Sequence, residues 1–196
     1  MKKSPGMFSS IQMEYCHASA YDEWMPVKKE QCSTGTERNH QGYRRWEKQM
    51  QDYTQLVDEL LEKECYIIDY LPETVPSDAE GQFWEVEHYL LNRKQYIWFR
   101  ERFVAVILKI MCYCHIVILW NGWIDRPKPE QINQAVSQIM GNRSGTLNCV
   151  FPTERSLLTV DGDCLNLTVY HPSGKMCRLL KRIAESEGLF WRLSES

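Results

Sequence analysis

The clearest pattern along the chain is an apolar stripe at helical spacing between residues 37 and 64. Its members follow one another at intervals of three or four residues, which places them on one face of a helix. Thr34 and Glu37 form a capping box ahead of it. Half of the stripe is aromatic, whereas coiled-coil seams favour Leu, Ile and Val, so we expect the helix to lie on its own domain. The stripe consists of Tyr43, Trp46, Met50, Tyr53, Val57 and Leu60.

Helices and strands alternate through the rest of the chain. Pro72 ends the first strand, and Ser77 with Glu80 forms a second capping box. In the first half we expect a strand over 65–71, a helix over 77–92 with Phe83, Val86 and Leu90 on one face, a helix over 95–112, and a strand over 113–119. In the second half we expect a helix over 129–140 closed by Gly141, strands over 146–151, 156–160 and 164–170, a helix over 174–187, and a strand over 189–193.

This order of elements predicts the fold class. We expect an α+β (mixed α/β) domain with one central mixed sheet and several packed helices. A long amphipathic helix precedes the sheet, and a β-hairpin, a helix and a strand close the chain. Asp161-Gly162-Asp163 is the expected hairpin turn. Residues 1–34 are expected to form an N-terminal arm, and residues 35–196 a single domain.

Composition is ordinary for a soluble globular protein of 196 residues, with 43% hydrophobic residues, 25% charged residues and a net charge of −3. These totals give no strong nucleic-acid signal, although they leave a local basic face open. No apolar export segment follows Lys2 and Lys3, so we expect a cytoplasmic protein whose eight cysteines are free thiols.

The apolar segment 103–120 has two interpretations. Its 18 residues approach the minimum length of a membrane span. Lys109 and His115 would then lie at membrane depth, where a charge is costly. We therefore favour a buried helix followed by a buried strand, and keep membrane attachment through 103–120 as an alternative.

Two thiols and an imidazole stand close together in Met111-Cys112-Tyr113-Cys114-His115. A structural zinc site needs four ligands, and no second pair of cysteines stands at a suitable distance. On the expected strand, Cys112 and Cys114 would share one face. We therefore predict two core thiols, and we expect neither a metal nor a cofactor.

Two other clusters suggest an enzyme as an alternative. Asp69, Glu85, Glu87 and His88 could converge on a metal and support hydrolysis. Ser173, Gly174 and Lys175 open a helix whose free backbone N–H groups could bind an anion. This second segment is not a P-loop, because Val169 and Met176 replace the required glycine and hydroxyl residue.

Aromatic residues make up 12% of the chain, including seven Trp. Tryptophan beside arginine is typical of interface anchors. The leading hypothesis is therefore a non-enzymatic module that binds a macromolecule, as accessory, regulatory or immunity-type proteins do. The expected partner is another protein, with a homodimer as a further option. The candidate binding residues are Arg44, Arg45, Trp46, Trp120, Trp123 and Arg126.

Overall fold

The structure is a computed structural model that describes the backbone of residues 37–76, 78, 80–91, 95–162 and 165–194. Side chains are described from Glu47 onward within these ranges, apart from Leu91 and Gln95. Gln41–Ser196 belong to one unit. The expected arm over residues 1–34 lies outside the described residues.

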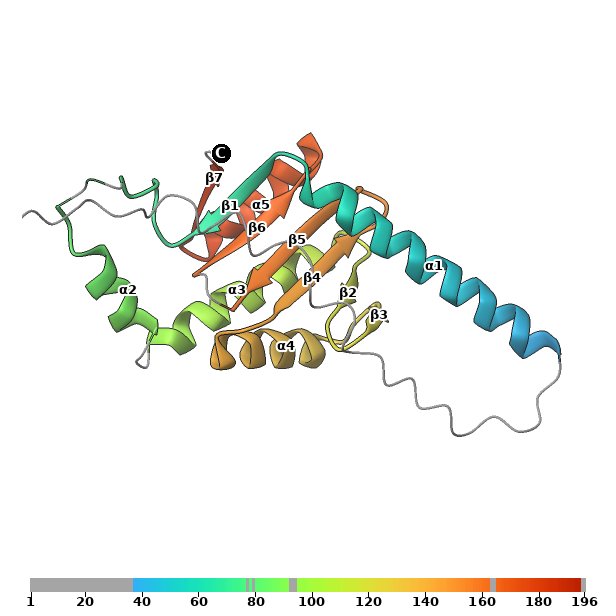
Figure 1. The fold of residues 1–196 in the computed structure, drawn as a ribbon. Coiled ribbons are helices and arrows are strands. Elements are labelled where there is room, and N and C mark those ends of the chain that lie inside the picture. Colours follow the sequence, from blue (N-terminus) through green and yellow to red (C-terminus); the bar gives the residue numbers. More distant parts are fainter. Residues whose placement is uncertain (1–36, 77, 79, 92–94, 163–164, 195–196) are drawn as a thin grey trace, which may run out of the picture. The chain divides into compact units, whose positions relative to one another are not determined.

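The described part of the chain has an α+β fold with five helices and seven strands (Figure 1). The strands form one open sheet in the order β3-β2-β4-β5-β6-β1-β7. The strands are β1 (Cys65–Asp69), β2 (Val117–Leu119), β3 (Trp123–Asp125), β4 (Thr146–Phe151), β5 (Ser156–Asp161), β6 (Asn166–Tyr170) and β7 (Phe190–Leu193). The helices are α1 (Glu37–Leu61), α2 (Phe83–Leu91), α3 (Gln95–Met111), α4 (Pro129–Asn142) and α5 (Gly174–Ser186).

Every pair of neighbouring strands is antiparallel, so the expected mixed sheet was wrong. The reason lies in the position of β1. The helical connection through α2 and α3 leads from β1 to β2, but these two strands are not neighbours. A parallel pair needs such a crossover between adjacent strands. Instead β1 inserts between β6 and β7 and pairs antiparallel with both.

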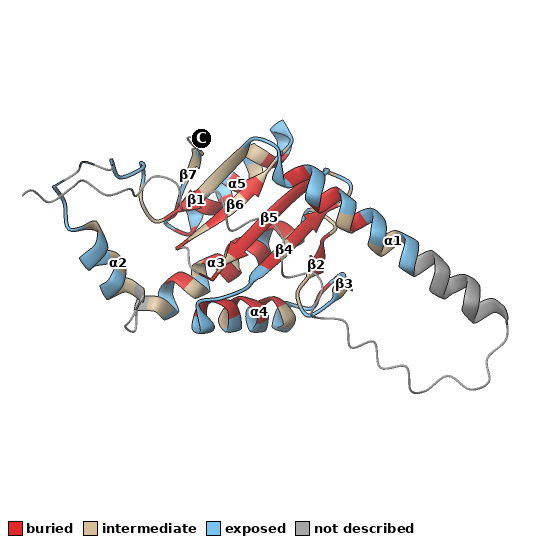
Figure 2. Ribbon diagram, in the orientation of Figure 1, coloured by how far each residue is buried: buried red, intermediate tan, exposed pale blue. Residues whose placement is uncertain are grey.

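The two faces of the sheet bury two separate apolar clusters. On β4, Leu147 and Cys149 belong to the large core that includes buried residues of α3, α4 and α5. Val150 points to the opposite face, as the alternation along a strand requires. There it packs with Leu157 and with α1. Figure 2 shows the buried inner sides of these elements.

The long helix predicted from the apolar stripe is α1, and its second half packs on the sheet. Val57 and Leu60 of the stripe are buried there. The Tyr53 ring lies 5.7 Å from the Trp123 ring. This contact confirms a helix laid on its own domain for the described side chains. Thr34 and the side chains of Tyr43 and Trp46 lie outside the described part of the chain.

The helix expected from Ser77 begins only at Phe83, so that boundary was wrong. Glu80 lies ahead of the helix rather than in its first turn. Gly81 follows it, and glycine is about 1 kcal/mol less favourable than alanine inside a helix. By contrast, Ser173 caps α5 as expected, because its hydroxyl accepts from the Met176 N–H.

The segment after α3 also differs from expectation. Cys112 and Tyr113 donate their backbone N–H groups to Lys109 and Ile110, so they prolong the helix end as a turn. The strand β2 starts only at Val117. Cys112 is exposed and Cys114 half-buried, so the prediction of two core thiols on one strand face was wrong.

The five cysteines among the described residues are free thiols: Cys65, Cys112, Cys114, Cys149 and Cys177. No described helix is both long enough and apolar enough to cross a membrane. The apolar segment 103–120 contributes core residues instead, with Phe103 and Ile107 fully buried in α3 and Ile118 in β2.

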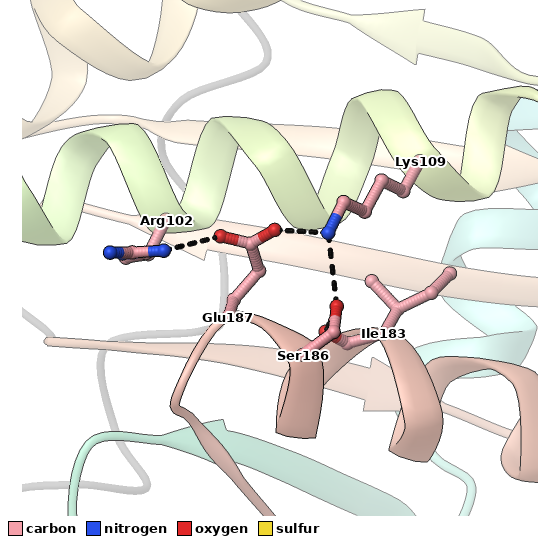
Figure 3. A network of polar contacts seen from close by, with 5 residues as sticks. All are labelled: Arg102, Lys109, Ile183, Ser186 and Glu187. Atoms are coloured by element: carbon pink, nitrogen blue, oxygen red, sulfur yellow. Dashed lines mark hydrogen bonds and ion pairs between the residues drawn. The ribbon is translucent and has the colours of Figure 1, made fainter.

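A charged cluster joins α3 to the end of α5 (Figure 3). The Glu187 side chain is 8% exposed and accepts from Arg102 Nη1 at 3.0 Å. Lys109 donates to the same carboxylate and to Ser186 Oγ at 2.9 Å. Burial alone would raise the pKa of Glu187, but the hydrogen bonds from Lys109 and Arg102 outweigh it and hold the pKa below its usual value.

We expect Glu187→Gln to lower the free energy of unfolding at pH 7 by about 1–2 kcal/mol, because two charge-assisted hydrogen bonds from the partly exposed Arg102 and Lys109 weaken. The folded-state pKa is lowered, so this stabilisation is complete at neutral pH and is lost as pH falls through the folded-state pKa. Urea denaturation at pH 7 and about pH 3 checks both points. Exposed Glu185→Gln is the control, and a gap between wild type and Glu187→Gln that persists at low pH would contradict the assignment.

Candidate functional site on the second helix

Exposed apolar side chains gather between residues 75 and 98. Ten large hydrophobic side chains are exposed among the described residues, and six of them lie in this stretch. Trp84 is the most exposed, at 77%. Single exposed apolar residues are common, whereas several in one short stretch of chain make that stretch a candidate for an interaction surface. We call these six residues the α2 surface: Val75, Trp84, Val86, Tyr89, Ile97 and Trp98.

The helix α2 departs from an ordinary surface helix at Glu87, Trp84 and Val86. The half-buried positions Phe83, Glu87 and Leu90 recur at spacings of four and three, so they form its inward stripe. Leu90 packs against the core. Trp84 and Val86 are exposed and lie on the two flanks of the outward side. An amphipathic helix normally buries its apolar side chains and exposes its charges. Here a carboxylate faces inward and a tryptophan faces outward.

The surroundings of Glu87 disfavour its negative charge. Burial raises its pKa, and the nearby charge of Asp69 raises it further. Burial, followed by Glu87 and Asp69, likewise raises the pKa of Tyr70 to about 12. The Tyr70 hydroxyl is buried and has no hydrogen-bond partner among the described residues. The inward side of α2 therefore places Leu90 against the core beside a carboxylate whose negative charge is disfavoured.

Asp69 has a structural role at the end of β1. Its Oδ2 accepts from Arg192 Nη2 at 2.7 Å, which joins β1 to β7. Arg192 also donates from Nη1 to Thr74 Oγ1 at 3.0 Å. The Leu71 N–H donates to Asp69 Oδ1 at 3.2 Å. These bonds fix the start of the segment that leads to α2.

The predicted acidic cluster is only partly assembled. Asp69 and Glu87 lie close enough for their charges to interact, whereas Glu85 points to solvent. His88 is also exposed. Within the described residues, no group of three or more His, Cys, Asp or Glu side chains could hold a metal ion.

The α2 surface lies in an acidic stretch of the chain. Residues 73–91 contain five carboxylates and neither Lys nor Arg. On α3, Arg102 lies 5.0 Å from the centre of the Trp98 ring, but its guanidinium is also bonded to Glu187. Arg93 and Lys94 follow in the sequence, so the acidic stretch covers only the part of the surface on and before α2. The five carboxylates are Glu73, Asp78, Glu80, Glu85 and Glu87.

The aromatic residues chosen from the sequence occupy other positions. Trp120 is half-buried against the large core, and Trp123 packs against α1. Arg126 is exposed after β3, with φ of 50°. The side chains of Arg44, Arg45 and Trp46 lie outside the described residues. A binding role for these six residues stays a prediction. The candidates chosen from the sequence did not include the exposed Trp84 and Trp98. The acidic residues around Trp84 could have indicated that this tryptophan is exposed.

The remaining sequence candidates each have separate partners. Cys112 Sγ donates to the Leu108 carbonyl at 3.5 Å, and His115 Nε2 contacts Asp125 Oδ1 at 2.5 Å. Burial raises the pKa of the Cys114 thiol, and Glu154 raises it further. Ser173 is engaged as the cap of α5, while Gly174 and Lys175 are exposed in its first turn.

No protein-family model, no curated protein and no solved structure matches this chain.

We expect Glu87→Gln to raise the urea midpoint at pH 7, because the folded protein disfavours the ionised carboxylate. The folded-state pKa of Glu87 is raised, so the wild type loses stability as pH rises through this pKa and the carboxyl ionises. Glu87→Gln has no carboxyl to ionise at this position and does not lose this stability. Urea denaturation of both proteins at about pH 4 and about pH 8 measures how the difference between their midpoints changes with pH. Glu85→Gln on the exposed side is the control, and a lower midpoint for Glu87→Gln would show that the carboxylate is stabilising.

Proposed function

We propose that this protein is a non-enzymatic protein-binding module whose α2 surface binds a cationic amphipathic helix of a partner protein. The observation that carries the proposal is the exposure of Trp84, Val86 and Tyr89 on one short helix whose inward stripe includes Glu87. A helix that turns Trp84 outward and Glu87 inward contradicts the ordinary rule of burial. Such local conflicts in a folded chain are typical of functional surfaces.

The residue types on the surface favour a protein partner. Tryptophan and tyrosine dominate interface hot spots, because they bury a large area at low entropic cost. Trp84 and Tyr89 lie about 7.5 Å apart along α2 at 1.5 Å per residue. Five residues also turn the helix by about 140°, so the two rings lie on different parts of the exposed side of α2 and contact a partner separately.

The charge of the surroundings favours a cationic partner. The four exposed carboxylates, Glu73, Asp78, Glu80 and Glu85, attract Lys and Arg side chains and repel acidic ones. Lysine or arginine can also lie over the exposed faces of Trp84 and Tyr89 as a cation–π contact. An amphipathic helix with Leu anchors and a Lys rim therefore matches the α2 surface in both apolar character and charge.

A designed helix tests this proposal directly. The probe is a labelled peptide of about 18 residues, or five turns, with Leu at i, i+4 and i+7 and Lys elsewhere. We expect Trp84→Ala to weaken its binding about tenfold or more, because the central anchor is lost. Glu85→Lys should weaken it through like-charge repulsion. Fluorescence anisotropy gives both affinities.

Three controls make the result specific. A peptide with Glu in place of every Lys should not bind. Tyr113→Ala removes an aromatic that is 69% exposed elsewhere, and Glu62→Lys reverses an exposed charge next to α1. Neither variant should change the affinity more than about twofold. Equal binding by wild type and Trp84→Ala would refute the proposal.

A further inference from the structure

Four exposed cations line one side of α5. At about 100° per residue they fall within an arc of about 120°, and they span about 10 Å of helix. None of them forms an ion pair with a described residue. Glu185 is the one exposed acid in the same helix. We call these cations the α5 basic face: Lys175, Arg178, Lys181 and Arg182.

The side of α5 opposite the basic face packs on the sheet, so the four cations point to solvent. Leu180 and Ala184 are fully buried on that packed side, and Met176 is 2% exposed. Elsewhere Arg102, Lys109 and other cations are bonded to carboxylates. On α5, Arg178 faces like charges three and four residues away, which repel one another in the free protein. A polyanion would remove this repulsion.

An exposed aromatic lies at the N-terminal end of this face. Lys109 on α3 reaches Ser186 at the C-terminal end of α5. The turn after α3 continues past that point, and the Cys114 thiol in this turn is within reach of the charge of Glu154 and, more weakly, of Lys175. Its neighbour Tyr113 is 69% exposed. The turn that carries this exposed ring is therefore the part of the chain after α3 that comes within range of the Lys175 charge.

We propose that the α5 basic face, together with Tyr113, binds a single-stranded nucleic acid. The cations contact successive phosphates, and the Tyr113 ring stacks on a base. The net charge of −3 does not prevent this, because charges more than about 10 Å apart are largely screened at physiological salt. This site is separate from the α2 surface and does not depend on its proposed function.

Other polyanions fit this face less well. Binding to a bilayer needs an apolar helix face that enters the lipid, but the apolar face of α5 is buried against the sheet. An acidic protein would need apolar anchors between the cations. The exposed positions of α5 include no large apolar side chain. Phosphate contacts, in contrast, require only the cations.

The test uses fluorescein-labelled oligothymidylate of about 12 nucleotides, a typical site size, with the full chain. Four phosphate contacts predict a log–log salt slope of about −2.8 on a single strand, so affinity should fall about 50-fold from 50 to 200 mM salt. The double variant Lys181→Gln/Arg182→Gln should bind more weakly, with the slope reduced by about 1.4. Tyr113→Ala should weaken binding about fivefold or more without changing the slope.

The matched control is Lys48→Gln/Lys63→Gln, which removes two exposed cations in and beside α1 and gives the same net charge. This double variant should bind the oligonucleotide like the wild type. Trp84→Ala should do the same, so the oligonucleotide test is independent of whether the α2 surface binds a helix. Equal losses in the two double variants would refute the proposal. So would no binding at 50 mM salt, or binding to phosphatidylserine vesicles in preference to the oligonucleotide.

Discussion

The pairing of β1 with both β6 and β7 is the constraint on which the rest of the described fold depends. This strand comes early in the chain, yet it joins the C-terminal hairpin to the last strand. The bond between Asp69 and Arg192 closes the end of β1 against β7. The segment that leaves this end continues to α2, so the same pairing that completes the sheet also determines where the α2 surface begins.

The helices that carry the two proposed surfaces are held with different strength. α5 buries one whole side against the sheet, and Glu187 at its end is bonded to Arg102 and Lys109 of α3. A helix fixed in this way presents its charges in a constant arrangement. α2 has a half-buried stripe with Glu87 in its middle. The stripe that holds α2 is therefore less apolar than the buried side of α5.

Much of the fold follows from local pattern, whereas strand pairing and exposure do not. Alternation and periodicity predicted α1, β4 and α5 closely, because each has one continuous apolar side. The segment 113–119 was misread, since an apolar run gives no sign that turn hydrogen bonds delay the strand until Val117. The orientation of α2 was misread for a similar reason. Val86 fits an inward stripe by spacing, but the folded chain turns Glu87 inward instead.

Acidic and basic side chains are concentrated in different parts of the chain, which the net charge of −3 does not show. Residues 73–91 carry five acids and no base, whereas α5 carries four exposed cations. Each surface therefore repels the partner that suits the other. The acidic surround of α2 disfavours phosphate, and the α5 basic face disfavours a cationic helix. Specificity is a difference between affinities, and like-charge repulsion is one of the ways in which a protein produces it. A net charge of −3 is consequently compatible with two binding surfaces of opposite preference.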